Sequence, residues 1–178
     1  MKNLIFGIAV YAFGVAAFAN TESPYRGQET REIKALSQQE VEGYLTGKGL
    51  GYAKAAELNQ YPGPRHVLDM AKELNLTEDQ RTRTQAVLDA MKAQAVALGK
   101  QLVEKERELD QLFANDSIDA NSLKTRLADI AVLQGEIRFA HLRAHLEQKA
   151  LLTKHQIRLY DQLRGYRTFH NGGHDHSH

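Results

Sequence analysis

The chain has 178 residues, a formal net charge of +1 and no cysteine. Its composition, with 42% hydrophobic and 25% charged residues, is typical of one globular domain with short appendages. The near-neutral charge argues against a general nucleic-acid binder, so we expect no nucleic-acid partner. The absence of cysteine excludes disulfides, thiolate metal sites and catalysis by cysteine.

The N-terminal residues 1–19 have the pattern of a secretory signal peptide. Lys2 provides a positive start, residues 4–16 form a continuous apolar run, and Ala17 and Ala19 supply the small residues that precede a cleavage site. The run is shorter than the roughly 20 residues of a membrane-spanning helix. We therefore expect a periplasmic protein that is cleaved near Ala19 and works without ATP, which that compartment lacks.

The next part of the chain predicts a lead-in followed by short helices. Residues 20–36 are polar and without a clear period, so we expect a flexible lead-in. A capping-box pattern opens a short helix expected over 37–45, and two more are expected over 52–58 and 64–74. We interpret the glycines of 47–51 as a linker, because a phosphate-binding loop needs a preceding strand and a following Lys-Ser/Thr.

Two long helices are predicted over 77–114 and 119–150, and a final short helix over 153–163. Because a tight loop joins the long helices, they must form an antiparallel hairpin. The fold class is therefore all-α, with a long antiparallel helical hairpin and flanking short helices. Because each helix has only a narrow apolar stripe, the hairpin alone buries little apolar surface. The short helices, a second subunit or a client must cover the apolar surface that remains. The expected stripes are Val87, Met91, Leu98, Leu102, Leu109 and Leu112 on the first helix and Leu123, Leu127, Ile130, Ile137 and Ala144 on the second.

The sequence Leu-Thr-x-x-Gln occurs twice, each time at a predicted helix start. In each copy the threonine caps the helix and the glutamine returns the hydrogen bond, so both copies also have a purely structural interpretation as helix starts. With two copies behind a signal peptide, residues 62–166 resemble the Spy/CpxP family of periplasmic stress proteins and the related CnrX-like heavy-metal resistance proteins. The motif residues are Leu76, Thr77 and Gln80 in the first copy and Leu152, Thr153 and Gln156 in the second.

The resemblance implies an all-α, cradle-shaped homodimer whose domain spans 37–166. Spy-like members bind unfolded proteins on a concave surface without ATP, CpxP-like members inhibit a membrane sensor kinase, and CnrX-like members bind metal and signal to a membrane partner. We therefore expect an ATP-independent envelope-stress chaperone with metal-responsive character, acting on unfolded periplasmic proteins. The alternative is a heavy-metal-binding sensor or resistance protein that regulates a membrane signalling partner. We expect no enzyme, because no nucleophile motif is present.

The C-terminal segment 167–178 is a predicted flexible tail rich in histidine. Its imidazoles can close around Zn, Ni, Co or Cu, although a solvated tail that binds metal incidentally accounts for the same residues. We expect that no metal is required. The candidate tail ligands are His170, His174, His176 and His178.

A second candidate metal site lies in the helical body. His141 and His145 are four residues apart, a spacing that lets two imidazoles of one helix face reach one ion. Leu142 stands where a zinc protease has its glutamate, so catalysis is unsupported. In the alternative interpretation, His141 is an interface histidine and His145 is a surface histidine. Met91 is then a residue of the hydrophobic core. Hairpin pairing adds Asp89 and Met91 from the opposite helix, and the preceding helix adds His66 if it folds back. The candidate ligands are His141, His145, His66, Asp89 and Met91.

Overall fold

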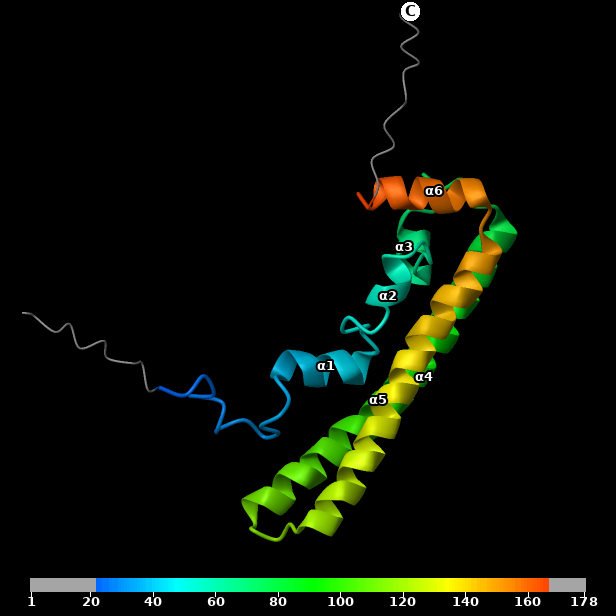
Figure 1. Ribbon diagram of the computed structural model, residues 1–178. Helices are drawn as coiled ribbons and strands as arrows, with labels where there is room; N and C mark the ends of the chain where they lie inside the picture. Colours follow the sequence, from blue (N-terminus) through cyan, green and yellow to red (C-terminus); the bar gives the residue numbers. More distant parts are fainter. Residues whose placement is uncertain (1–21, 167–178) are drawn as a thin grey trace, which may run out of the picture. The chain divides into compact units, whose positions relative to one another are not determined.

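The computed structural model describes residues 22–166, and in this range it is all-helical, with turns and loops between helices and no β-strand (Figure 1). This confirms the predicted fold class of a long helix pair with shorter flanking helices. The predicted signal peptide and the histidine-rich tail lie outside the described residues. The helices are α1 (Gln38–Thr46), α2 (Lys54–Glu57), α3 (Pro64–Asp69), α4 (Glu78–Ala114), α5 (Ala120–Leu151) and α6 (Lys154–Leu163).

The chain divides into two compact units, residues 1–30 and residues 31–178. The described part of the first unit, 22–30, consists of turns, one of which is closed by a bond from the Arg26 N–H to the Ser23 carbonyl at 3.1 Å. All six helices belong to the second unit. None of the helices in the described range is long and apolar enough to cross a membrane.

The second unit is built on the α4–α5 hairpin, which turns at residues 115–119 (Figure 1). Two polar contacts fix its register. The Gln148 side-chain amide donates to the Thr84 hydroxyl at 3.1 Å, and Arg126 pairs with Glu108 at 2.6 Å. The hydrophobic core lies where α1 and the segment before it pack on the hairpin, and its buried members are Ile33, Leu36, Tyr44, Leu102, Val103, Ile130 and Ile137.

The buried face of α4 differs from the predicted stripe. Leu102 is buried as predicted, but the other predicted residues are only partly buried. At Gly99 an added Cβ would lie 2.2 Å from the Tyr44 carbonyl oxygen, so the α1 backbone crosses α4 directly at this glycine. On α5 the prediction is wrong for Leu127, which is 48% exposed. The buried α4 residues are Thr84, Leu88, Ala95, Gly99, Leu102, Val103 and Glu106.

The segment 31–36 packs on the hairpin, so the predicted flexible lead-in over 20–36 is wrong for its last residues. Ile33 and Leu36 are buried in the core. The Lys34 backbone N–H and ammonium group both donate to the Asp110 carboxylate, at 2.9 and 2.8 Å. The segment is ordered because it supplies apolar side chains to the core and its backbone finds a hydrogen-bond acceptor there.

Helix α3 ends at Asp69, five residues before the predicted end at residue 74. The chain continues as turns, with the Leu74 N–H donating to the Met70 carbonyl at 2.9 Å. Asn75 has a φ of 48°, in the left-handed region that asparagine tolerates better than most residues. These turns bring Leu74 into a second cluster with Val67, Leu152 and Tyr160.

The two Leu-Thr-x-x-Gln motifs meet at the end of the hairpin opposite its turn. Each threonine caps its helix as predicted, and both capping boxes are complete. The structure adds a contact that the sequence analysis missed: the Gln80 amide donates to Gln156 Oε1 at 2.9 Å, and the Gln156 amide donates back to Gln80 Oε1 at 3.0 Å. The same two amides also donate to the carbonyls of Leu151 and Leu74. The motifs therefore form one polar clamp between the starts of α4 and α6.

Candidate functional site

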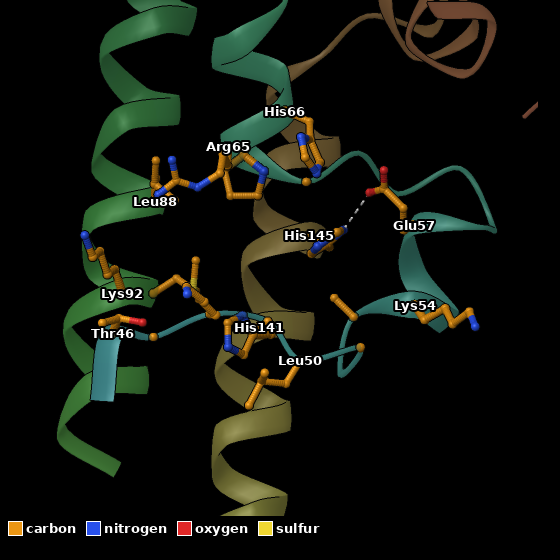
Figure 2. Close-up of a pocket in the computed structure, with 18 of the residues that line it drawn as sticks. Thr46, Leu50, Lys54, Glu57, Arg65, His66, Leu88, Lys92, His141 and His145 are labelled. Atoms are coloured by element: carbon orange, nitrogen blue, oxygen red, sulfur yellow. Dashed lines mark ion pairs between the residues drawn. The ribbon is translucent and has the colours of Figure 1, made fainter. Parts of the chain in front are cut away.

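A pocket of about 590 Å³ lies between the segment 46–66 and the half of the hairpin remote from its turn (Figure 2). Its size is within the usual range for small-molecule sites, about 300 to 1,000 Å³. The glycine-rich segment 47–51, which we interpreted as a linker, forms part of its wall. Four of the five predicted ligands of the helical body line it, namely His66, Met91, His141 and His145.

His145 is held in a defined orientation on α5. Its Nδ1 donates to the Tyr61 carbonyl at 2.7 Å, because a carbonyl can only accept. In the neutral ring Nε2 then carries no proton. This nitrogen lies beside Gly63, where an added Cβ would approach it to 3.2 Å. Glu57 Oε2 lies 3.8 Å from Nδ1, the ion pair marked in Figure 2.

His141 lies one turn before His145 and is 4% exposed. Its ring stacks on Tyr52 with centroids 6.4 Å apart. Its Nε2 is buried and has no hydrogen-bond partner among the described residues. Burial, and to a lesser extent the nearby His145, lower the pKa of His141 below its usual value of 6.5.

We expect acid to destabilise the protein through His141. The unfolded chain takes up this proton at a higher pH than the folded chain, so stability falls as pH drops below about 6.5 and the loss is complete below the folded-state pKa. Urea unfolding measured from pH 8 to pH 5 should show a shallower pH dependence for His141→Phe than for the parent chain. His155→Phe, which removes an exposed imidazole on α6, is the control. An unchanged slope in His141→Phe would contradict this assignment.

Glu57 is a residue of the pocket that sequence reasoning missed. Its Oε1 accepts from the hydroxyls of Tyr160 and Tyr166, at 2.5 and 3.0 Å, and lies 3.3 Å from the Arg164 Nε. Burial and the hydrogen bond to Glu57 raise the pKa of Tyr160, which stays a neutral donor. Glu57 thereby fixes the short helix α2 to the end of α6. No motif or period marks it in the sequence.

The pocket is lined by an excess of positive charge. Lys48, Lys54, Arg65, Lys92 and Arg164 all contribute to it, whereas its acidic lining is limited to the single carboxylate described above. Lys48 pairs with a glutamate outside the pocket at 2.6 Å. Lys54, Arg65 and Lys92 are exposed and form no ion pair within residues 22–166.

The predicted metal ligands of the helical body are only partly brought together. Asp89 is exposed and outside the pocket, where its carboxylate accepts from Gln85 at 2.9 Å, so the prediction that it joins the histidines is wrong. His66 is half-exposed, with Nδ1 3.5 Å from Asp69. Among the described residues no three or more histidine, aspartate or glutamate side chains are grouped so that they could hold a metal ion. The tail histidines lie outside this range.

A second feature is an apolar stripe on the outside of α5, which we call the α5 outer stripe. At 100° per residue its members lie opposite the buried face of the helix. Val132, Phe139 and Leu146 are 64%, 53% and 57% exposed, and the Arg143 guanidinium lies 5.8 Å from the centre of the Phe139 ring. The sequence analysis recognised only the inward stripe. The α5 outer stripe consists of Ala128, Val132, Gly135, Phe139, Leu142 and Leu146, at alternating spacings of four and three residues.

Comparison of the chain with models of protein families, with curated proteins and with solved structures gave no match.

Proposed function

We propose that this protein is an exported, ATP-independent chaperone that holds non-native polypeptides on the α5 outer stripe. The observation that carries the proposal is the exposure of three large apolar side chains in a row along one helix, next to a guanidinium group. Exposed apolar patches on soluble proteins commonly mark interaction sites. The paired Leu-Thr-x-x-Gln motifs and the signal-peptide pattern support the same class of function through the resemblance to Spy/CpxP proteins.

The spacing of the stripe favours weak, repeated contacts with a client. Val132, Phe139 and Leu146 follow each other at seven-residue intervals, about 10 Å apart along a helix. Between Val132 and Phe139 stands Gly135, which offers no side chain to a partner. A standard protein interface buries about 800 Å² on each partner, which a row of isolated side chains does not readily supply. Loose binding of this kind suits a chaperone that must release its client without ATP.

A homodimer is part of the proposal, as the resemblance implies, with its contacts away from the α5 outer stripe. The alternating spacing of the stripe is also that of a coiled-coil seam. A test of client binding must therefore also measure the mass of the protein.

The test is suppression of client aggregation by a double variant, Phe139→Ser with Leu146→Ser. We expect the variant to need at least about five-fold more protein than the parent chain to halve light scattering by a chemically denatured client, since two of the three large exposed contacts are lost. Phe113→Ser is the matched control, because Phe113 is 58% exposed but lies near the hairpin turn, off the stripe. Both changes are on the surface and should leave stability within about 0.5 kcal/mol.

The molar mass, measured by multi-angle light scattering on the same samples, distinguishes client binding from dimerisation through the stripe. A mass that is unchanged in the double variant, together with lost suppression, supports client binding. A mass that halves while suppression persists identifies the stripe as a dimer seam and overturns the proposed binding surface. Absence of suppression by the parent chain at every ratio overturns the chaperone function itself.

A metal-binding sensor that regulates a membrane signalling partner is the second candidate function. The observation in its favour is that His66, Met91, His141 and His145 line one pocket. Imidazole and thioether ligands suit Zn, Ni, Co and Cu. The sensor hypothesis requires these four residues, without Asp89, to bind one such ion.

A further inference from the structure

The pocket combines an apolar wall with a cationic rim. Leu50, Leu88 and Met91 contribute apolar surface, and the glycine-rich segment 47–51 contributes backbone without bulky side chains. In Figure 2, Arg65 and Lys92 lie on one side of the two histidines of α5 and Lys54 lies on the other, with the ends of both lysine side chains turned outward. A site that is mostly apolar with a few convergent polar groups is the usual form of a small-molecule pocket.

The charges of the rim favour an anion over a cation. Lys54, Arg65 and Lys92 are not neutralised by any carboxylate in the described part of the chain. Glu57 is the acidic group of the lining; its Oε1 accepts from two tyrosine hydroxyls and lies against Arg164, while its Oε2 is buried without a hydrogen-bond partner among the described residues. Side chains of one sign around a cleft with low-dielectric walls attract ions of the opposite sign. A divalent metal ion would enter against this field.

His141 belongs to the lining of the pocket and has unused hydrogen-bonding capacity. His141 is 4% exposed, and its Nε2 is buried without a hydrogen-bond partner within residues 22–166. Its Nδ1 side faces Gly49 of the glycine-rich segment, at 3.9 Å from an added Cβ. A buried polar group without a partner is costly, and an imidazole can carry its proton on either nitrogen. His141 can therefore donate to a carboxylate oxygen that reaches it.

We infer that this pocket binds a small organic anion, a carboxylate on an apolar body. The apolar body packs against Leu50, Leu88 and Met91. The carboxylate is held by charge-assisted contacts with Lys92, Arg65 and His141, which are stronger than neutral hydrogen bonds. This binding site is separate from the α5 outer stripe and does not depend on the proposed chaperone function.

The test is isothermal titration calorimetry with sodium octanoate on the full chain in which the four tail histidines are replaced by alanine. These replacements remove metal binding by the tail, and octylammonium chloride, octanamide and zinc chloride are the comparison ligands. We expect octanoate to bind one-to-one, at least ten-fold more tightly than octylammonium or octanamide. Lys92→Glu should weaken octanoate binding at least ten-fold, because it reverses one charge of the rim.

Lys100→Glu is the matched control, since Lys100 is also an exposed lysine of α4 but lies outside the pocket. It changes the net charge as Lys92→Glu does, and octanoate binding should stay within two-fold of the parent. Equal binding of octanoate and octylammonium would overturn the inference in favour of a merely apolar surface. One-to-one zinc binding at micromolar or tighter affinity, without octanoate binding, would overturn it in favour of the metal sensor. Absence of any binding would overturn it as well.

Discussion

Replacing Gly99 with alanine is expected to destabilise the protein by about 3 kcal/mol and to release α1 from the hairpin. An added Cβ would lie 2.2 Å from the Tyr44 carbonyl oxygen and 2.8 Å from its carbon, which are backbone atoms that cannot move without moving the helix. Tyr44 is itself buried in the core. The measurement is urea unfolding followed by circular dichroism, with limited proteolysis to detect exposure of residues 38–46.

Gly135→Ala is the opposite case and the control. Gly135 lies in the middle of α5, and no atom comes within 4 Å of an added Cβ. Alanine has the higher helix propensity, so this change should stabilise the protein by about 0.5 to 1 kcal/mol. If both variants gained stability, the close crossing of α1 over α4 would be wrong.

The second large effect is expected at the clamp between the two Leu-Thr-x-x-Gln motifs. Gln156→Leu removes the amide group that exchanges hydrogen bonds with the Gln80 side chain. It also leaves the Thr153 N–H and the Leu74 carbonyl without their side-chain partner. Unsatisfied buried groups of this kind cost about 1 to 3 kcal/mol each, so a loss of about 3 kcal/mol is expected. Urea unfolding measures it. Gln85→Leu, at an exposed glutamine of α4, should change stability by less than about 0.5 kcal/mol.

A double-mutant cycle with Gln80→Leu separates the clamp from two independent caps. If the glutamines act together, the double variant should lose about 1 to 2 kcal/mol less than the sum of the single losses. Strict additivity would show that each glutamine serves only its own helix start.

The parts of the fold that could be predicted are those encoded by neighbouring residues. Ser37, Thr77 and Thr153 were identified as helix caps because a capping box is complete within four residues, and all three boxes are present. The hairpin followed from two long periodic segments and a short break between them. Pairing across the hairpin also added Met91 to His141 and His145 as a candidate ligand, and all three line the pocket.

The parts that could not be predicted depend on contacts between distant segments. The α4 stripe was assigned from its largest apolar residues, but α1 approaches where the side chain is smallest, at Gly99. Glu57 gains its role from tyrosines about a hundred positions later. Asp89 was expected to join His145, yet its position on the helix turns its carboxylate to Gln85 and solvent. Composition and period contain none of this information.

The pairing of Gln80 with Gln156 also bears on how the hairpin selects its alignment during folding. A helical seam with a heptad-like repeat tolerates a slip of seven residues, because apolar side chains again meet apolar side chains. Such a slip would move the two amides about 10 Å apart along the helix axis and leave both without each other. Since Gln80 and Gln156 lie at the end of the hairpin remote from its turn, their side chains form hydrogen bonds only when α4 and α5 are in the correct register along their whole length. The clamp therefore stabilises the correct register relative to misaligned hairpins, which keep their apolar contacts but lose the contact between the two glutamines.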